Sequence, residues 1–281
     1  MTIIKESVVS PNWLFNHLND PDIVIIDCRF QLSDPSWGRQ QYETSHIPEA
    51  FYLDLNQDLS SPVQKQGGRH PLPNPDVLAE KLANRGIHLN QTAVVAYDDS
   101  RFAFAARLWW LLRYLGHDQV AVLDGGWKMW QNAGYPVSAD IPSPKAGSFT
   151  PQLREHWVVD REAVKAHQGD DQTVIIDSRD PDRYRGEREP IDPVAGHIPT
   201  AVNFPWKDVT DEEGNLYHPA EQRQRWLEGN SPIAADLEKI VYCGSGVTAC
   251  VNLLSLHLAQ LPNGKLYAGS WSDWCSYLLD S

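Results

Sequence analysis

This 281-residue chain contains a long internal repeat, and the repeat limits its possible folds more than any other feature. Four blocks of the first half return in the same order in the second half. The pairs are VIIDCRF (24–30) with VIIDSRD (174–180), SHIPEAFYLDL (45–55) with GHIPTAVNFPW (196–206), AVVAYDD (93–99) with KIVYCGS (239–245), and VAVLDGGWKMW (120–130) with KLYAGSWSDW (265–274). Because a shared order at a nearly constant spacing is hard to obtain by chance, we interpret the chain as a tandem of one domain type.

The length of the chain also favours two domains, since one domain usually contains roughly 100 to 200 residues. The segment SADIPSPKAGSFTP (138–151) lies between the repeats and is rich in Pro, Ser and Gly, with little periodicity. Such a composition is typical of a linker. We therefore expect a first domain over 1–140, a linker over 141–155 and a second domain over 156–281.

Short apolar segments alternate with helical patterns in both halves. The runs IVIID, AVVAY, TVIID and KIVY have the length and the β-branched composition of buried strands. Parallel sheets covered by helices on both faces produce continuous apolar strands of this kind. Each half is therefore predicted to be an α/β domain, with a parallel sheet covered by helices.

The composition limits the partners and the compartment of the protein. The formal net charge is -13 and no run of Lys and Arg is present, which argues against nucleic-acid or anionic-membrane partners. No apolar stretch approaches the length of about 20 residues that spans a bilayer. The N-terminal sequence MTIIKESVVSPNWL lacks the features of a signal peptide. We expect a cytoplasmic protein.

The chain has four cysteines, and their spacing includes no CxxC pair. Neither a zinc site nor a disulfide framework is indicated, and reduced thiols in a cytosolic protein fit this pattern better. The four are Cys28, Cys243, Cys250 and Cys275.

Cys243 is the cysteine with a distinctive setting. The strand KIVY leads directly into it, Gly244-Ser245-Gly246 follows, and a helix is predicted to begin near Val247 or Thr248. Two glycines allow a tight turn whose N–H groups form a cradle for an anion. A helix N-terminus and such a cradle lower the pKa of a thiol, so the loop favours a nucleophilic thiolate. This chemistry requires neither a metal nor an organic cofactor.

The alternative is that Cys243 is a buried structural cysteine at a strand end. The first repeat argues against this, because Asp98 stands at the equivalent position and the fold therefore does not require cysteine there. The first domain is accordingly predicted to be non-catalytic. Cys250 lies in the predicted helix among apolar residues and is interpreted as structural, and we assign no role to Cys28 or Cys275.

These features resemble the rhodanese superfamily over nearly the whole chain: the HIP segments, the cysteine at a strand end with its six-residue loop, and the GxW segments. CGSGVTA (243–249) is similar to the loop of 3-mercaptopyruvate sulfurtransferases, whereas thiosulfate:cyanide rhodaneses carry basic residues there. The resemblance implies two tandem rhodanese-like domains and a persulfide on Cys243. It also implies 3-mercaptopyruvate as the small-molecule sulfur donor, and a thiol, thioredoxin or cyanide as the acceptor.

The resemblance further implies an arginine that binds the anionic part of the substrate, and Arg183 matches it. The alternative for Arg183 is a structural ion pair. Related mercaptopyruvate enzymes have a second arginine after an EP segment, where this chain has Ile191, and Arg188 is the candidate to replace it. The loop residues expected to contact the substrate are Gly244, Gly246, Val247 and Thr248.

The family's proposed proton relay consists of an Asp, a His and the loop Ser. Ser245 matches the serine, and His70 in GGRHPLP (67–73) matches the histidine. The acidic position aligns with Asn56, two residues after Asp54, so the relay is predicted to be incomplete. His70 is expected to donate a hydrogen bond to the substrate carbonyl; the alternative is an exposed loop histidine.

Some residues recur in both repeats and are therefore expected to be structural. They are Arg29 and Arg179, His46 and His197, and Trp127 and Trp271.

Three further functions remain as alternatives. Thiosulfate is the alternative donor. Phosphoester chemistry is disfavoured, because cysteine phosphatases need an arginine six residues after the nucleophile and this chain has Ala249 there. A non-catalytic binding module is disfavoured by the complete CGSGVTA segment.

Overall fold

The computed structural model describes residues 4–229 and 231–279 and divides into two compact units. Unit 1 is built from the chain up to Ser61, from Leu72–Arg154 and from Glu213–Asn215. Unit 2 is built from Pro62–Pro71, from Glu155–Glu212 and from Leu216 onwards. Each unit thus includes a short segment that belongs to the other repeat in the sequence.

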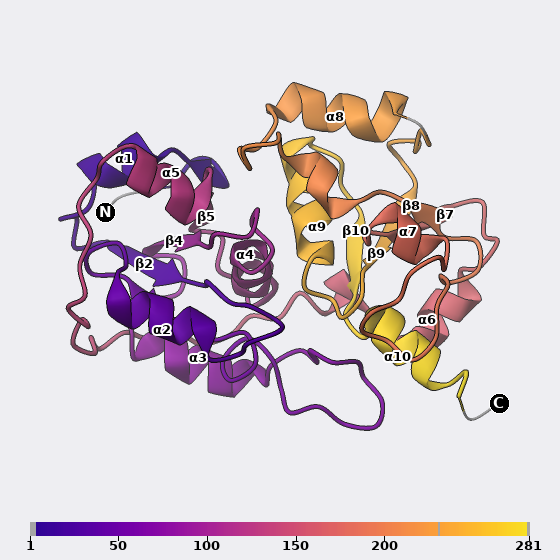
Figure 1. Cartoon of the computed structure of the whole chain (residues 1–281), viewed down its shortest axis with the longest axis horizontal. Helices are drawn as coiled ribbons and strands as arrows, with labels where there is room; N and C mark the ends of the chain where they lie inside the picture. The colour runs from indigo at the N-terminus through magenta and orange to yellow at the C-terminus, as the bar shows by residue number, and fades with distance from the viewer. Residues whose placement is uncertain (1–3, 230, 280–281) are drawn as a thin grey trace. The chain divides into compact units, whose positions relative to one another are not determined.

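Unit 1 is an α/β domain whose five strands form a parallel sheet in the order β1-β5-β4-β2-β3. In Figure 1, α1 and α5 lie on one side of the strands, and α2 and α3 lie on the other. The elements are β1 (Val8–Val9), α1 (Pro11–Asn16), β2 (Ile23–Asp27), α2 (Trp37–Thr44), β3 (Phe51–Tyr52), α3 (Pro75–Ala83), β4 (Ala93–Tyr97), α4 (Ala105–Tyr114), β5 (Val120–Leu123) and α5 (Gly126–Asn132).

Unit 2 repeats this architecture, with a parallel sheet in the equivalent order β6-β10-β9-β7-β8. The α/β prediction is therefore confirmed for both halves. The elements are the 3-10 helix η1 (Glu155–Trp157), β6 (Val158–Val159), α6 (Arg161–Ala166), β7 (Thr173–Asp177), α7 (Pro181–Tyr184), β8 (Val202–Asn203), η2 (Trp206–Val209), α8 (Pro219–Glu228), β9 (Glu238–Tyr242), α9 (Ala249–Leu258), β10 (Gly264–Tyr267) and α10 (Ser270–Ser276).

The central strands of the two sheets are buried. Every residue of β4 is buried, and so is every residue of β9 after Glu238. Burial on both faces explains why β4, and β9 from Ile240 onwards, are continuous apolar runs rather than alternating ones. All strands of each sheet are parallel, so loops that follow strands of one sheet leave from its carboxyl-terminal edge. The loop after β4 therefore starts at the same edge as the loop after β2, and the loop after β9 at the same edge as the loop after β7.

An aspartate and an arginine form a buried ion pair at the end of the first long strand of each repeat. Arg29 Nη2 lies 2.6 Å from Asp27 Oδ2, and Arg179 Nη2 lies 2.6 Å from Asp177 Oδ2. In both cases the same nitrogen also donates to the backbone carbonyl directly before the HIP segment. The two arginines therefore connect a strand end to the following turn, which is the structural role expected from their recurrence.

The segment expected to be a linker packs along unit 1 as far as Arg154. Gly147 N–H donates to the carbonyl of Ala83, and Gln152 N–H donates to the carbonyl of Leu115. Phe149 is buried. The segment has little regular secondary structure, yet its backbone is held by unit 1.

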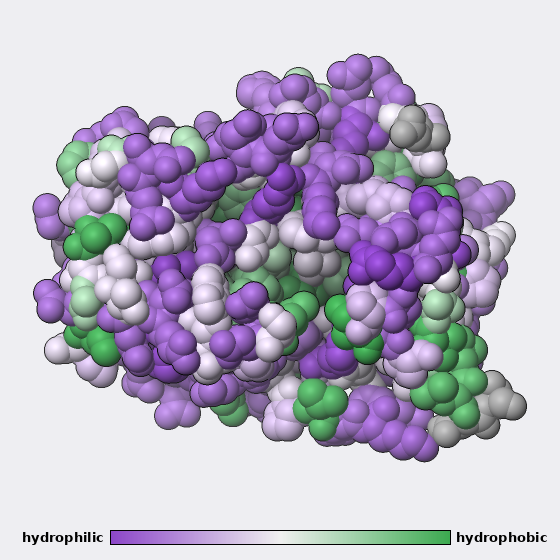
Figure 2. Space-filling model, in the orientation of Figure 1, coloured by the Kyte–Doolittle hydropathy of each residue, from purple (hydrophilic) through white to green (hydrophobic). Residues whose placement is uncertain are grey.

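Within residues 4–229 and 231–279, no helix combines the length and the apolar character needed to cross a bilayer. On the face drawn in Figure 2, hydrophilic residues predominate and hydrophobic residues are scattered among them. This polar surface agrees with the large net charge of -13.

Candidate active site

Cys243 directly follows β9, and the segment around α10 holds its backbone. Cys243 N–H donates to Ser270 Oγ at 3.1 Å, and the Cys243 carbonyl accepts from Trp271 N–H at 3.0 Å. The next carbonyl, that of Gly244, accepts from Ser272 N–H at 2.9 Å. The residue Cys243 is only 2% exposed. Hydrogen bonds on both sides therefore hold the backbone of the predicted nucleophile.

The loop after Cys243 turns tightly towards α9. Gly246 has φ of 77°, and a Cβ atom on it would lie 2.4 Å from the carbonyl oxygen of Ala268, so no other residue fits this position. Across the described part of the chain, no hydrogen bond takes up the N–H groups of four loop residues. They are Gly244, Ser245, Val247 and Thr248. A buried loop with free N–H groups provides donors for an anion.

The equivalent loop of unit 1 has an aspartate in place of the cysteine, and its N–H groups donate to that aspartate. The carboxylate of Asp98, at the position equivalent to Cys243, accepts N–H groups from Ser100, Phe102, Phe104 and Ala105 at 2.8–3.1 Å. The side chain is buried, with 2% exposure for the residue. The loop of unit 1 thus holds a carboxylate of its own, and a cavity of about 40 Å³ lies beside it.

Ser245 and His70 meet in unit 2, as expected from the sequence. His70 Nδ1 lies 2.7 Å from Ser245 Oγ, and each residue is 6% exposed. His70 is therefore not an exposed loop histidine. The segment Pro62–Pro71 that carries it is anchored by Gly67 N–H, which donates to Asp273 Oδ1 at 2.7 Å.

The acidic position of the expected relay lies in unit 1. Asn56 is exposed, and its N–H donates to Asp54 Oδ1 at 2.8 Å. Asp54 is buried, and its other oxygen is 3.4 Å from the Tyr52 hydroxyl. Asp54 thus closes a local turn in its own unit.

Two arginines lie beside Gly244. A Cβ atom placed on Gly244 would be 3.0 Å from Arg69 Nη2 and 3.6 Å from both Nη atoms of Arg183. Arg183 was expected here, whereas Arg69 was missed. The available signal was its place next to His70 in GGRHPLP. Both guanidinium groups form ion pairs with the buried carboxylate of Asp192.

Arg188 has different neighbours. Its Nε donates to Asp182 Oδ2 at 2.5 Å, and its side chain is 49% exposed. Val247 and Thr248, in contrast, belong to the Cys243 loop itself. Val247 is buried in it, and Thr248 is the N-cap residue of α9. Arg183, Arg69 and the loop thus surround Gly244, while Arg188 lies on the acidic side chains near α7.

The other three cysteines are buried and free. Burial is the main cause that raises the pKa of the Cys28 thiol, and the same cause raises the pKa of Cys275. Cys250 Sγ lies 3.5 Å from the Gly246 carbonyl oxygen inside the fold. A raised pKa disfavours the thiolate, so Cys28 and Cys275 are poor nucleophiles.

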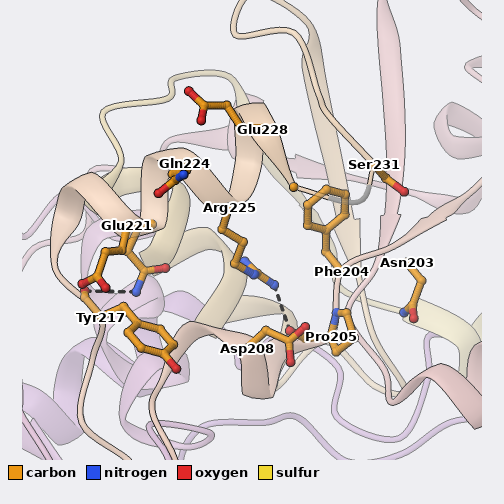
Figure 3. Close-up of a pocket in the computed structure, with 12 residues that line it drawn as sticks. Asn203, Phe204, Pro205, Asp208, Tyr217, Glu221, Gln224, Arg225, Glu228 and Ser231 are labelled. Carbon is orange, nitrogen blue, oxygen red and sulfur yellow. Dashed lines mark hydrogen bonds between the residues drawn. The ribbon is translucent and has the colours of Figure 1, made fainter.

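Unit 2 also contains a larger cavity of about 480 Å³ (Figure 3). Arg225 extends into it from α8, donates to the Pro205 carbonyl at 2.8 Å, and has a pKa that burial lowers to about 10. The cavity is lined by Asn203, Phe204, Pro205, Asp208, Tyr217, Glu221, Gln222, Gln224, Arg225, Glu228, Gly229 and Ser231. None of these described lining residues belongs to the Cys243 loop, so the cavity is separate from the candidate active site.

Comparisons with known proteins show which family this chain belongs to. The family described as Rhodanese-like domain matches residues 10–133 and 160–277. A probable 3-mercaptopyruvate sulfurtransferase of Pseudomonas aeruginosa is 45% identical over 261 residues, which cover 92% of this chain and 90% of that protein. A putative thiosulfate sulfurtransferase, SseB of Mycobacterium tuberculosis, is 35% identical over 92% of this chain and 89% of its own length.

A solved structure is also similar. The crystal structure of SseA from Escherichia coli, a 3-mercaptopyruvate sulfotransferase with the rhodanese fold, matches with a TM-score of 0.82 and 32% sequence identity. The match covers 95% of this chain and 100% of that one. The similarity therefore extends over both repeats.

Proposed function

This chain belongs to the rhodanese family, and we propose that it is a sulfurtransferase that carries sulfur from 3-mercaptopyruvate as a persulfide on Cys243. The observation that carries the proposal is the position of Cys243, buried after β9 at the start of a loop with free N–H groups and two guanidinium groups. Names of relatives that cover nearly the whole chain support the choice of donor.

The first half-reaction begins with the Cys243 thiolate. It attacks the sulfur of 3-mercaptopyruvate, a sulfur–sulfur bond forms, and the carbon–sulfur bond of the donor breaks. The electron pair of that bond leaves on pyruvate as its enolate, which then takes up a proton. The protein retains a Cys243 persulfide, whose outer sulfur can accept hydrogen bonds from the loop.

The remaining site residues bind and orient the donor in this proposal. Arg183 binds the carboxylate, since a planar guanidinium matches a carboxylate with two parallel hydrogen bonds. The loop residues Gly244, Ser245, Val247 and Thr248 contribute N–H groups towards the transferred sulfur, and Gly246 forms the turn that orients them. Arg188 is at most a peripheral contact, because Asp182 already engages its Nε.

Ser245 and His70 act as one hydrogen-bonded pair in the proposed mechanism. Their 2.7 Å contact orients the serine hydroxyl within the loop. From this position the pair stabilises the negative charge that develops on the donor's carbonyl oxygen when the carbon–sulfur bond breaks. Because Asn56 carries no carboxylate, the scheme assigns no proton-transfer role to this position.

In the second half-reaction a thiol, thioredoxin or cyanide attacks the outer sulfur and restores the Cys243 thiolate. Unit 1 takes no part in the chemistry of this proposal, since Asp98 fills the loop equivalent to the catalytic one. We place the reaction in the cytoplasm, because four free cysteines suit a reducing compartment.

Intact-protein mass spectrometry after brief treatment with 3-mercaptopyruvate tests the proposal. We expect the native protein to gain one sulfur, about 32 Da, and Cys243→Ser to gain none. Cys28→Ser is the matched control and should gain the sulfur as the native protein does. Absence of an adduct on the native protein, or an adduct that persists in Cys243→Ser, would contradict the proposed function.

Thiosulfate is the second candidate donor. The two guanidinium groups beside Gly244 favour it, because they place positive charge next to a loop that has none of its own. The similarity to SseB, a putative thiosulfate sulfurtransferase, also supports it. A kcat/KM for thiosulfate above that for 3-mercaptopyruvate would make thiosulfate the main donor.

A further inference from the structure

The side chain of Arg69 lies beside Gly244 in the Cys243 loop, although Arg69 is far from this loop in the sequence. Its N–H donates to Ser272 Oγ at 3.1 Å, and Ser272 N–H in turn donates to the Gly244 carbonyl. The backbone of Arg69 is therefore tied to the same residue that holds the loop. Its side chain is 28% exposed, so solvent and small molecules can reach the guanidinium.

One carboxylate holds both arginines. Asp192, whose side chain is 2% exposed, forms an ion pair with Arg69 Nη1 through Oδ1 and with Arg183 Nη2 through Oδ2, the second at 3.3 Å. Arg183 is also bound by Glu189 through Nε and Nη2. Buried carboxylates therefore hold both guanidinium groups beside the loop.

This arrangement leaves a nitrogen atom near Gly244 available to a ligand on each guanidinium group. Within residues 4–229 and 231–279, Arg69 Nη2 and Arg183 Nη1 take part in no hydrogen bond, and both lie near Gly244. Negative charge on Cys243 also acts on Arg69, since it opposes the lowering of the Arg69 pKa by burial. An anion bound next to the cysteine would meet both nitrogens.

We propose that Arg69 is a second substrate-binding arginine, which shares the anionic group of the sulfur donor with Arg183 and favours dianionic donors. The proposal rests on the proposed function, because it concerns the donor of the same cysteine. Asp192 is the positioning residue that keeps the two guanidinium groups side by side. Arg69 thereby supplies charge that the sequence CGSGVTA lacks.

The charge of the donor determines how much Arg69 contributes. Loss of a charge-assisted hydrogen bond to a bound anion weakens binding by roughly 10- to 100-fold. Thiosulfate carries two negative charges and 3-mercaptopyruvate carries one, so the Coulomb attraction lost with Arg69 is larger for thiosulfate. An effect on binding rather than on bond breaking should appear mainly in KM.

Steady-state kinetics of Arg69→Gln with the two donors tests the proposal. We expect KM to rise about 10-fold or more for thiosulfate and by a smaller factor for 3-mercaptopyruvate, with kcat within about threefold of the native value. Arg69→Lys should recover part of the thiosulfate activity, since it restores the charge without the planar group. Arg154→Gln, which removes a guanidinium paired with Asp118 in unit 1, is the matched control and should leave both KM values unchanged.

Sulfate provides a second measurement that involves no sulfur transfer from the probe. It should inhibit the native protein competitively against 3-mercaptopyruvate, and about 10-fold more weakly in Arg69→Gln at equal ionic strength. The proposal is overturned if Arg69→Gln changes kcat/KM equally for both donors, leaves it unchanged, or lowers kcat alone. Persulfide formation on Cys243, scored by mass in the same samples, separates that failure from a failure of the proposed function.

Discussion

Ser245 Oγ lies 2.7 Å from Nδ1 of His70, although the two residues are 175 positions apart in the sequence. Each residue is only 6% exposed, so the contact is formed largely away from bulk solvent. The hydroxyl and the imidazole therefore form one unit rather than two independent groups.

The first prediction concerns this pair. Ser245→Ala and His70→Asn should each lower kcat for 3-mercaptopyruvate by roughly 10- to 100-fold, because each removes the same hydrogen bond from the site. The double variant should lose about as much as either single variant. Steady-state rates of the four proteins give the coupling. Losses that multiply in the double variant would mean that the two residues act separately.

The second prediction concerns the turn at Gly246. Gly246→Ala combines a φ of 77° with a Cβ atom 2.4 Å from the Ala268 carbonyl oxygen. We expect a loss of about 2–4 kcal/mol in the free energy of unfolding, together with loss of persulfide formation. Gly169→Ala is the control: its φ is 79° and nothing lies within 4 Å, so strain alone should cost about 1 kcal/mol. Urea unfolding measures the stability of both variants. Equal losses would mean that the contact with the Ala268 carbonyl oxygen adds nothing to the backbone strain.

The third prediction concerns the anion inside unit 1. Asp98→Ala leaves the N–H groups of its four hydrogen-bond donors without their carboxylate. We expect the free energy of unfolding to fall by about 2–4 kcal/mol, since a buried donor without a partner is costly and the variant leaves several of them. The free energy of unfolding of Asp98→Asn should lie between those of the native protein and Asp98→Ala. A thermal unfolding midpoint unchanged in Asp98→Ala would show that the carboxylate does not hold the loop.

The fourth prediction concerns pH. His117 is fully buried, accepts a hydrogen bond from Asn90 N–H at Nδ1, and contacts the Gln119 carbonyl oxygen at 3.1 Å through Nε2. The pair of contacts fits a neutral ring, and burial lowers the pKa of His117 to about 4. Between about pH 6.5 and 4 the unfolded chain therefore binds a proton that the folded chain does not, and stability falls as the pH is lowered.

The size of this effect follows from the same pKa values. From pH 7 to pH 5 the native protein should lose about 2 kcal/mol more than His117→Gln, which cannot take up the proton. Urea unfolding at the two pH values gives the four free energies required. Equal losses in the two proteins would mean that His117 does not titrate in this range.

The sequence was sufficient to predict the main architecture. Repeated apolar runs define β4 and β9, and their burial in two sheets of equivalent order follows from the same residue pattern. Cys243 was identified because a strand end, two glycines and a helix start are all local signals. His70 and Ser245 were identified from the family resemblance, and the structure brings them together.

Arg69 and Asp192 were not predicted, because no local pattern relates them. Residue 69 is far from residues 183 and 192 in the sequence, and only the folded chain places their side chains around one loop. The segment 141–155 illustrates a similar limit. Its composition indicates irregular backbone, but it gives no information about whether that backbone is packed, and Phe149 is in fact buried.

The short exchange of segments between the units has a consequence for how the repeats can be separated. A protein cut at the end of the first repeat, and containing only residues 156–281, would retain Cys243 and its loop but would lose Pro62–Pro71 and with it His70 and Arg69. The second repeat thus contains all strands of its sheet, but it lacks two of the side chains proposed to act at the candidate active site. Although the duplication is visible in the sequence, the two copies are no longer interchangeable modules, and each half depends on the other for its full set of contacts.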